Sequence, residues 1–168
     1  RDRDATKVQN HFQIRSVKRG LGMAILKNTL FINSDPVAYY CFKKILNKVN
    51  PDVVHCHCLF NISLAPIILA AKKRIPCIVT VHDYWPVCLN NLLRKPNLIL
   101  CEETSWNYCV PGCKHRKIGA FLKPFIIDGM HQRAKILEKN SVLVTVSDFV
   151  KDAMINFGYP PRNVTVIH

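Results

Sequence analysis

The sequence has few acidic residues and lacks the long runs that identify several common classes of protein. Among its 168 residues, 11 are Asp or Glu and 24 are Lys or Arg, which gives a formal charge of +13. No apolar run approaches the roughly 20 residues of a membrane-spanning helix. Apolar residues make up 49% of the chain and charged residues 21%, which excludes a disordered or collagen-like protein. The length predicts one globular domain.

Several catalytic motifs are absent as well. The sequence contains no P-loop, no GxGxxG turn and no metalloprotease helix. Ser147 follows an apolar run but lacks the flanking glycines of a hydrolase nucleophile elbow, so we interpret it as a helix N-cap. The basic excess leans toward the N-terminal third without forming a dense block. It indicates a partner with anionic phosphate, whether nucleotide, lipid headgroup or nucleic acid.

Helical and strand patterns alternate after residue 34, and residues 1–34 are a basic lead-in with only a partial element. Asp35-Pro36 predicts the start of a helix that ends at Asn50-Pro51. Its predicted apolar face consists of Val37, Tyr40, Cys41, Ile45, Leu46 and Val49. The remaining pattern predicts helices at about 62–74, 118–139 and 148–157 and buried strands at 52–56, 77–81, 142–146 and 164–167. This order predicts an α/β protein with a doubly wound, open parallel sheet of the Rossmann-like kind.

The two ends of the sequence indicate whether it covers a whole domain. The sequence starts at Arg1 rather than at Met, and no secretory signal is visible. A complete sheet of this type opens with a strand and a glycine-rich turn, and the sequence shows neither before residue 35. The last predicted strand runs to the end of the chain. We therefore expect truncation at both ends.

Polar side chains follow two of the predicted strands. His55 and His57 flank Cys56 at the end of the first strand, and His82-Asp83 follows the second. Ligands of parallel sheets bind at the carboxyl ends of the strands. For His55 we favour packing against the backbone, whereas for His82 we favour function, because packing poorly explains a polar pair directly after a buried strand. His82 can donate to a sugar hydroxyl or stabilise a charge, and Asp83 can fix its tautomer or cap the loop.

Four cysteines lie close together in one irregular region, with the spacing C-x12-C-x7-C-x3-C. They are Cys88, Cys101, Cys109 and Cys113. Clustered thiolates outside regular structure suit a structural metal, zinc first, with His115 as a spare ligand. Disulfides in a surface loop and unlinked cysteines are the alternatives. Disulfides are less expected because no secretory signal is visible.

Residues 114–127 combine basic and large apolar side chains. The pattern fits a membrane-surface face, and it also fits a core-facing stripe with a solvated edge, which we favour.

Three segments together are similar to one enzyme family. They are PDVVHCHCLFN at 51–61, IPCIVTVHDYWPVC at 75–88 and SVLVTVSDFVKDAMINFGYPPRNVTVIH at 141–168. Over residues 35–168 the chain resembles the N-terminal domain of family 4 glycosyltransferases, which are retaining enzymes of the GT-B fold. The cysteines after HDYWPVC also resemble those of a subgroup of that family.

The resemblance implies the incomplete N-terminal half of a GT-B glycosyltransferase, a retaining, hexosyltransferase-like enzyme of polysaccharide biosynthesis. This half would bind a saccharide or lipid-linked acceptor, and a missing C-terminal domain would bind most of the nucleotide-sugar donor. By resemblance His82 matches the histidine that contacts the transferred sugar, and Asp83 is its motif neighbour, so these two are the candidate catalytic residues. The resemblance also implies acceptor binding by His57 and Arg133. Asn140-Ser141 stands where the family usually has an aspartate.

We therefore expect residues 35–168 to form a Rossmann-like glycosyltransferase domain with a cysteine-rich insertion at 86–116, inactive on its own. The expected location is cytoplasmic, with peripheral contact at the inner face of a membrane as an open alternative. No nucleic-acid partner is expected. The rival interpretations are a zinc-stabilised, basic nucleic-acid-binding module, which would bind DNA or RNA in a salt-dependent way, and a non-catalytic remnant.

Overall fold

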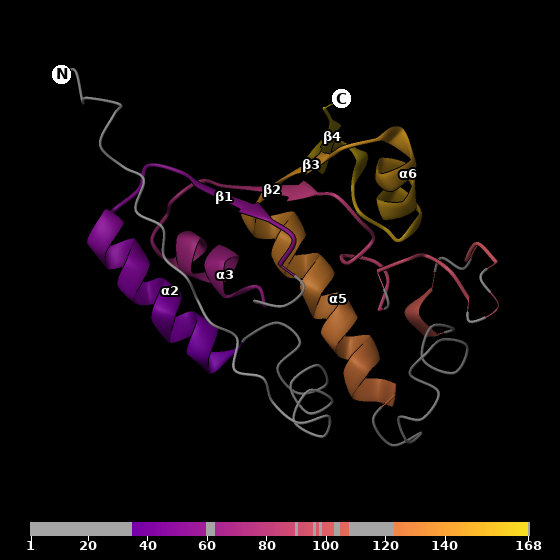
Figure 1. Cartoon of the computed structure of the whole chain (residues 1–168), viewed down its shortest axis with the longest axis horizontal. Coiled ribbons are helices and arrows are strands. Elements are labelled where there is room, and N and C mark those ends of the chain that lie inside the picture. Colours follow the sequence, from indigo (N-terminus) through magenta and orange to yellow (C-terminus); the bar gives the residue numbers. More distant parts are fainter. Residues whose placement is uncertain are drawn as a thin grey trace.

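The computed structural model describes residues 35–59, 63–89, 91–95, 97, 99–102, 105–107 and 123–167. In this part of the chain, four parallel strands form one sheet in the order β1-β2-β3-β4. The strands are β1 (Val54–His57), β2 (Cys77–Val81), β3 (Val142–Thr145) and β4 (Val164–Val166). The helices are α2 (Pro36–Val49), α3 (Ala65–Lys72), α5 (Lys123–Asn140), α6 (Asp148–Asn156) and the short 3-10 helix η3 (Pro161–Asn163) (Figure 1). The predicted open, parallel, Rossmann-like α/β sheet is confirmed.

The described helices cover one face of this sheet. Helices α3, α5 and α6 contact the strands, and α2 packs against α3 on the same side (Figure 1). Strands joined in sequential order by right-handed crossovers place their connecting helices on one side. Val79 and Leu143 therefore lie inaccessible beneath the helices, whereas His55, His57 and Val142 are exposed on the opposite face.

Short-range interactions set where the helices begin and end. The Asp35 carboxylate accepts hydrogen bonds from the first backbone N–H groups of α2, and Asn50 ends that helix in the left-handed region with φ 46°. Ser147 caps α6 as predicted, since its hydroxyl accepts a hydrogen bond from the backbone of that helix. Gly158 follows α6 with φ 93°, a conformation that glycine adopts without strain.

The predicted apolar face of α2 is only partly right. Val37, Tyr40 and Val49 are exposed, and Leu46 is the one member of the predicted set that is buried. Ala38 is buried in place of Val37, and the partly buried Tyr39 and Phe42 pack against the core. Two adjacent aromatic residues allow two helical registers, and packing against α3 selects the one that turns Tyr39 inward.

The core lies between the helices and the sheet. Its largest inaccessible side chains include Leu64 and Ile67 near the start of α3, Leu137 of α5 and Met154 of α6. Trp85 lies four residues beyond the end of β2 and is also inaccessible. Its indole belongs to the same buried hydrophobic cluster. Among the described helices, none is long and apolar enough to cross a membrane.

Candidate functional site

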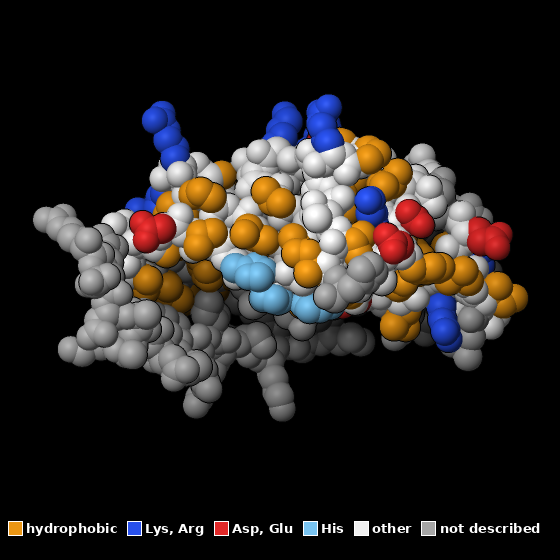
Figure 2. Space-filling view, turned by 90° about the horizontal axis from the view of Figure 1, so that it is seen from above, with side chains coloured by type: hydrophobic (Ala, Val, Ile, Leu, Met, Phe, Trp, Pro, Cys, Tyr) orange, Lys and Arg blue, Asp and Glu red, His pale blue; other side chains and the backbone are white. Residues whose placement is uncertain are grey.

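The carboxyl ends of β1 and β2 bring three histidines together. His57 pairs with Thr80 across the two strands, and His82 follows two residues later on the same side of the pleat. His55, His57 and His82 consequently lie on the face of the sheet that the described helices leave uncovered. Seen from above that face, histidine side chains gather in one group (Figure 2). The structure therefore unites the two histidine features that the sequence placed at separate strand ends.

Each histidine of β1 contacts the residue two places beyond its direct partner, which lies on β2 for His55 and directly after β2 for His57. His55 is paired with Ile78 and its Nε2 lies 2.8 Å from the Oγ1 of Thr80. His57 is paired with Thr80 and its Nδ1 lies 2.9 Å from the Nε2 of His82. The ring centroids of His55 and His57 are 4.3 Å apart, and those of His57 and His82 are 5.2 Å apart with nearly parallel planes. We call this arrangement the histidine row.

Crowding in the histidine row favours the neutral form of His57. Burial lowers the pKa of His57 below its usual value, and the neighbouring His55 and His82 lower it further through their charges. The hydrogen bond between Nδ1 of His57 and Nε2 of His82, at 2.9 Å, contains one proton, so one ring donates and the other accepts. Two doubly protonated rings would lose this bond and repel each other. His57 thus engages Nε2 of His82 and leaves Nδ1 of His82 as the nitrogen for another partner.

Asp83 fixes the loop that follows β2. Its Oδ1 accepts a hydrogen bond from the backbone N–H of Trp85 at 2.9 Å. Its other oxygen, Oδ2, lies 4.0 Å from the Sγ of Cys58, a residue with φ 29° directly after β1. Of the two roles expected for this carboxylate, the described contacts show the loop cap. A part for Asp83 in catalysis stays a prediction.

Arg133 lies beneath this loop. It is only 6% exposed, and its Nη1 donates to the backbone oxygen of Trp85 at 2.8 Å. Burial lowers the pKa of Arg133 to about 10, so the guanidinium still carries its charge at neutral pH. Its described contact supports the loop from inside, and acceptor binding by Arg133 stays a prediction.

Three consecutive carbonyl groups after β2 each accept a hydrogen bond from a different part of the chain. Arg133 of α5 binds the oxygen of residue 85, Tyr159 donates to that of Pro86 at 3.5 Å, and the Nε1 of Trp106 donates to that of Val87 at 2.9 Å. We call residues 85–87 with these donors the carbonyl clamp. The sequence gives no signal for Tyr159 or Trp106, because nothing in their spacing reveals a contact with so distant a part of the backbone.

The predicted cysteine site is only partly described. Cys88 and Cys101 are both buried, 5% and 7% exposed. Cys109, Cys113 and the spare ligand His115 lie outside the described residues. In the part of the chain that the structure covers, no three His, Cys, Asp or Glu side chains are grouped as metal ligands. Buried thiols are suitable zinc donors, and the zinc site stays a prediction.

A model of Glycosyltransferase Family 4 matches residues 9–168, so the chain belongs to that family. No curated protein and no solved structure matches it. Membership of this family and the parallel sheet do not favour the nucleic-acid-binding alternative.

Proposed function

We propose that this chain is the acceptor-binding half of a retaining, hexosyltransferase-like glycosyltransferase. The enzyme transfers a sugar from a nucleotide-sugar donor to a saccharide or lipid-linked acceptor in polysaccharide biosynthesis. A C-terminal domain supplies most of the donor contacts. The proposal is carried by the hydrogen-bonded pair His57–His82 at the strand ends of a Family 4 chain.

In this proposal His82 orients the transferred sugar. Its Nδ1 hydrogen-bonds a hydroxyl of the donor sugar, while His57 holds the ring in place through Nε2. Retaining transfer of this kind requires the leaving diphosphate and the acceptor hydroxyl on the same face of the sugar while positive charge develops on it. Fixed hydrogen bonds at that point lower the barrier because they need no reorganisation during the reaction. The carbonyl clamp supports this function by fixing the loop behind His82.

The test is a transfer assay on the protein that contains both halves. We expect His82→Ala to lower turnover by about tenfold or more, the scale of one lost positioned donor. Val142→Ala is the control, because Val142 is 55% exposed at the start of β3 and lies outside the histidine row and the carbonyl clamp. Unchanged turnover in His82→Ala would exclude the proposed role.

We also propose that Cys88, Cys101, Cys109 and Cys113 hold a structural zinc ion, supported by the burial of the first two and by the thiolate chemistry that zinc prefers. Elemental analysis of the purified protein before and after chelation tests this site. About one zinc per chain, lost together with part of the stability on chelation, is the expected result. We further propose that the enzyme works in the cytoplasm.

A further inference from the structure

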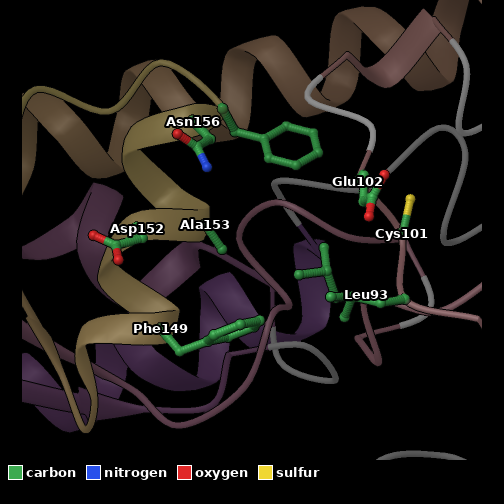
Figure 3. Close-up of a pocket in the computed structure, with 9 residues that line it drawn as sticks. Leu93, Cys101, Glu102, Phe149, Asp152, Ala153 and Asn156 are labelled. Carbon is green, nitrogen blue, oxygen red and sulfur yellow. The ribbon is translucent and has the colours of Figure 1, made fainter.

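A pocket lies between helix α6 and two stretches of the chain after β2, at residue 93 and at residues 100–102 (Figure 3). Its volume is about 280 Å³, near the lower end of the roughly 300–1,000 Å³ of small-molecule sites, so it has room for one small ring. It is lined by Leu93, Leu100, Cys101, Glu102, Phe149, Asp152, Ala153, Asn156 and Phe157.

One aromatic contact joins this pocket to the candidate site. The ring of Phe149 meets that of Tyr84 edge to face, with centroids 6.2 Å apart and planes at 77°. Tyr84 is two residues beyond His82 in the chain. The pocket and the histidine row therefore adjoin opposite ends of one short segment.

The pocket combines an apolar floor with two polar groups. Leu93 and Ala153 are buried, and the ring of Phe149 points toward Leu93 while remaining 53% exposed. Glu102 and Asn156 stand on opposite walls, one on the loop and one on α6 (Figure 3). Asp152 also borders the pocket, but its carboxylate points away from the cavity (Figure 3).

The charge at this pocket is opposite to that of the whole chain. None of its described lining residues is Lys, Arg or His, although the chain carries a formal charge of +13. A phosphate or carboxylate would meet no positive charge among the described lining residues and would be repelled by Glu102. An uncharged ring with hydroxyl groups fits both the apolar floor and the polar walls of the pocket. Its C–H face can pack on Phe149, and its hydroxyls can bond the carboxylate of Glu102 and the amide of Asn156.

We infer that this pocket binds an uncharged sugar ring, which, given the proposed function, is part of the acceptor. Such a subsite selects acceptors whose ring at this position carries no phosphate or carboxylate.

The first test is binding of glucose, galactose and N-acetylglucosamine to the full chain, followed by NMR. We expect these probes to shift the signals of Phe149 and Asn156, and Phe149→Ala to weaken binding about tenfold, as expected for loss of one well-packed aromatic contact. Phe125→Ala is the matched control, since Phe125 is 51% exposed on α5 and does not line the pocket. Absence of sugar-induced shifts at this pocket, or equal binding by both variants, would overturn the inference.

A second variant separates a sugar from a cationic ligand. Glu102→Gln keeps the shape of the wall and removes its charge. We expect glucose binding to change by less than about threefold, because a neutral amide still bonds hydroxyls. Agmatine, a small organic cation, serves as the comparison probe. Tighter binding of agmatine than of any sugar, lost in Glu102→Gln, would assign the pocket to cations and overturn the inference.

The transfer assay distinguishes failure of the subsite from failure of the proposed function. We expect Phe149→Ala to raise KM for the acceptor about tenfold with little change in kcat, whereas His82→Ala lowers kcat. An unchanged acceptor KM in Phe149→Ala beside a lowered kcat in His82→Ala overturns the subsite alone. Sugar binding at the pocket beside normal turnover in His82→Ala overturns the catalytic role and leaves the subsite intact.

Discussion

Strands β1 and β2 lie side by side, yet they present different residues to solvent. In β1 buried and exposed residues alternate, with Val54 and Cys56 beneath the helices and His55 and His57 on the open face. β2 lies between two other strands and is buried along most of its length. The contrast shows how the candidate site is built. The face that packs against the helices fixes the position of each strand, and the face of β1 that the described helices leave uncovered carries the imidazoles.

The largest expected effect comes from the covered face. Leu143→Ala, in the middle of the sheet, should lower the free energy of unfolding by about 2–5 kcal/mol, because it leaves a cavity where no neighbour can move in. Val142 is adjacent to Leu143 in the same strand but is 55% exposed. Val142→Ala should therefore change the free energy of unfolding by less than about 0.5 kcal/mol. Chemical denaturation of both variants measures the difference. Similar losses in the two would show that the faces are not distinct in solution.

A slightly smaller effect is expected where the carbonyl clamp joins the core to the site. Arg133→Ala removes the bond to the oxygen of Trp85 and much of a buried side chain, so we expect a loss of about 2–4 kcal/mol. Arg133→Met keeps most of the apolar volume. It should lower the free energy of unfolding by nearer 1 kcal/mol, about the net value of one hydrogen bond. The variants separate packing from bonding. If Met destabilises as much as Ala, the guanidinium bond rather than the volume holds the loop.

The sequence was sufficient for the features that depend on neighbouring residues. Short apolar runs predicted β2 with its observed ends, and Asp35 and Ser147 predicted two helix starts, because strand burial and capping are local properties. The outward face of α2 was misjudged, since periodicity alone could not choose between the adjacent Tyr39 and Tyr40. Contact with α3 makes that choice.

The candidate site shows the same division between local features, which the sequence predicts, and tertiary contacts, which it does not. The polar residues at the strand ends could be identified from the sequence, because parallel strands end at a common edge. The bond between His57 and His82 could not, since it depends on the register of β1 against β2. The pattern His-x-His on one strand and Thr-x-His on the next is the signal that could have suggested it. The contacts of Arg133, Trp106 and Tyr159 depend on tertiary packing and have no such signal.

A moderate effect is expected at the contact between His55 and Thr80, the polar link between the two strands. Thr80→Val keeps the shape of the side chain and removes Oγ1, so we expect a loss of about 0.5–1.5 kcal/mol in the free energy of unfolding. The double variant Thr80→Val with His55→Ala measures the coupling, which should be about 1 kcal/mol. A coupling near zero would mean that the 2.8 Å contact contributes nothing to stability and that His55 is held by the strand alone.

The smallest expected effect on stability lies on the open face, at His57. At pH 7.5 the imidazole is neutral in both the folded and the unfolded chain, so His57→Gln should change the free energy of unfolding by less than about 0.5 kcal/mol. Because the pKa of His57 is lowered in the folded protein, the unfolded chain takes up the proton first as the pH falls below about 6.5. The free energy of unfolding should therefore decrease through this range, until the pH passes below the folded pKa.

In His57→Gln that decrease should be smaller than in the unaltered protein. Denaturation at intervals from pH 7.5 to 5 measures it, and His131→Gln shows the effect of removing an exposed imidazole elsewhere. The same titration followed by the ring signals of His82 would report whether its environment changes as His57 takes up its proton. An equal or steeper decrease in His57→Gln would contradict the lowered pKa. That result would also contradict the division in which the face covered by helices determines stability and the other face of β1 carries the titrating groups.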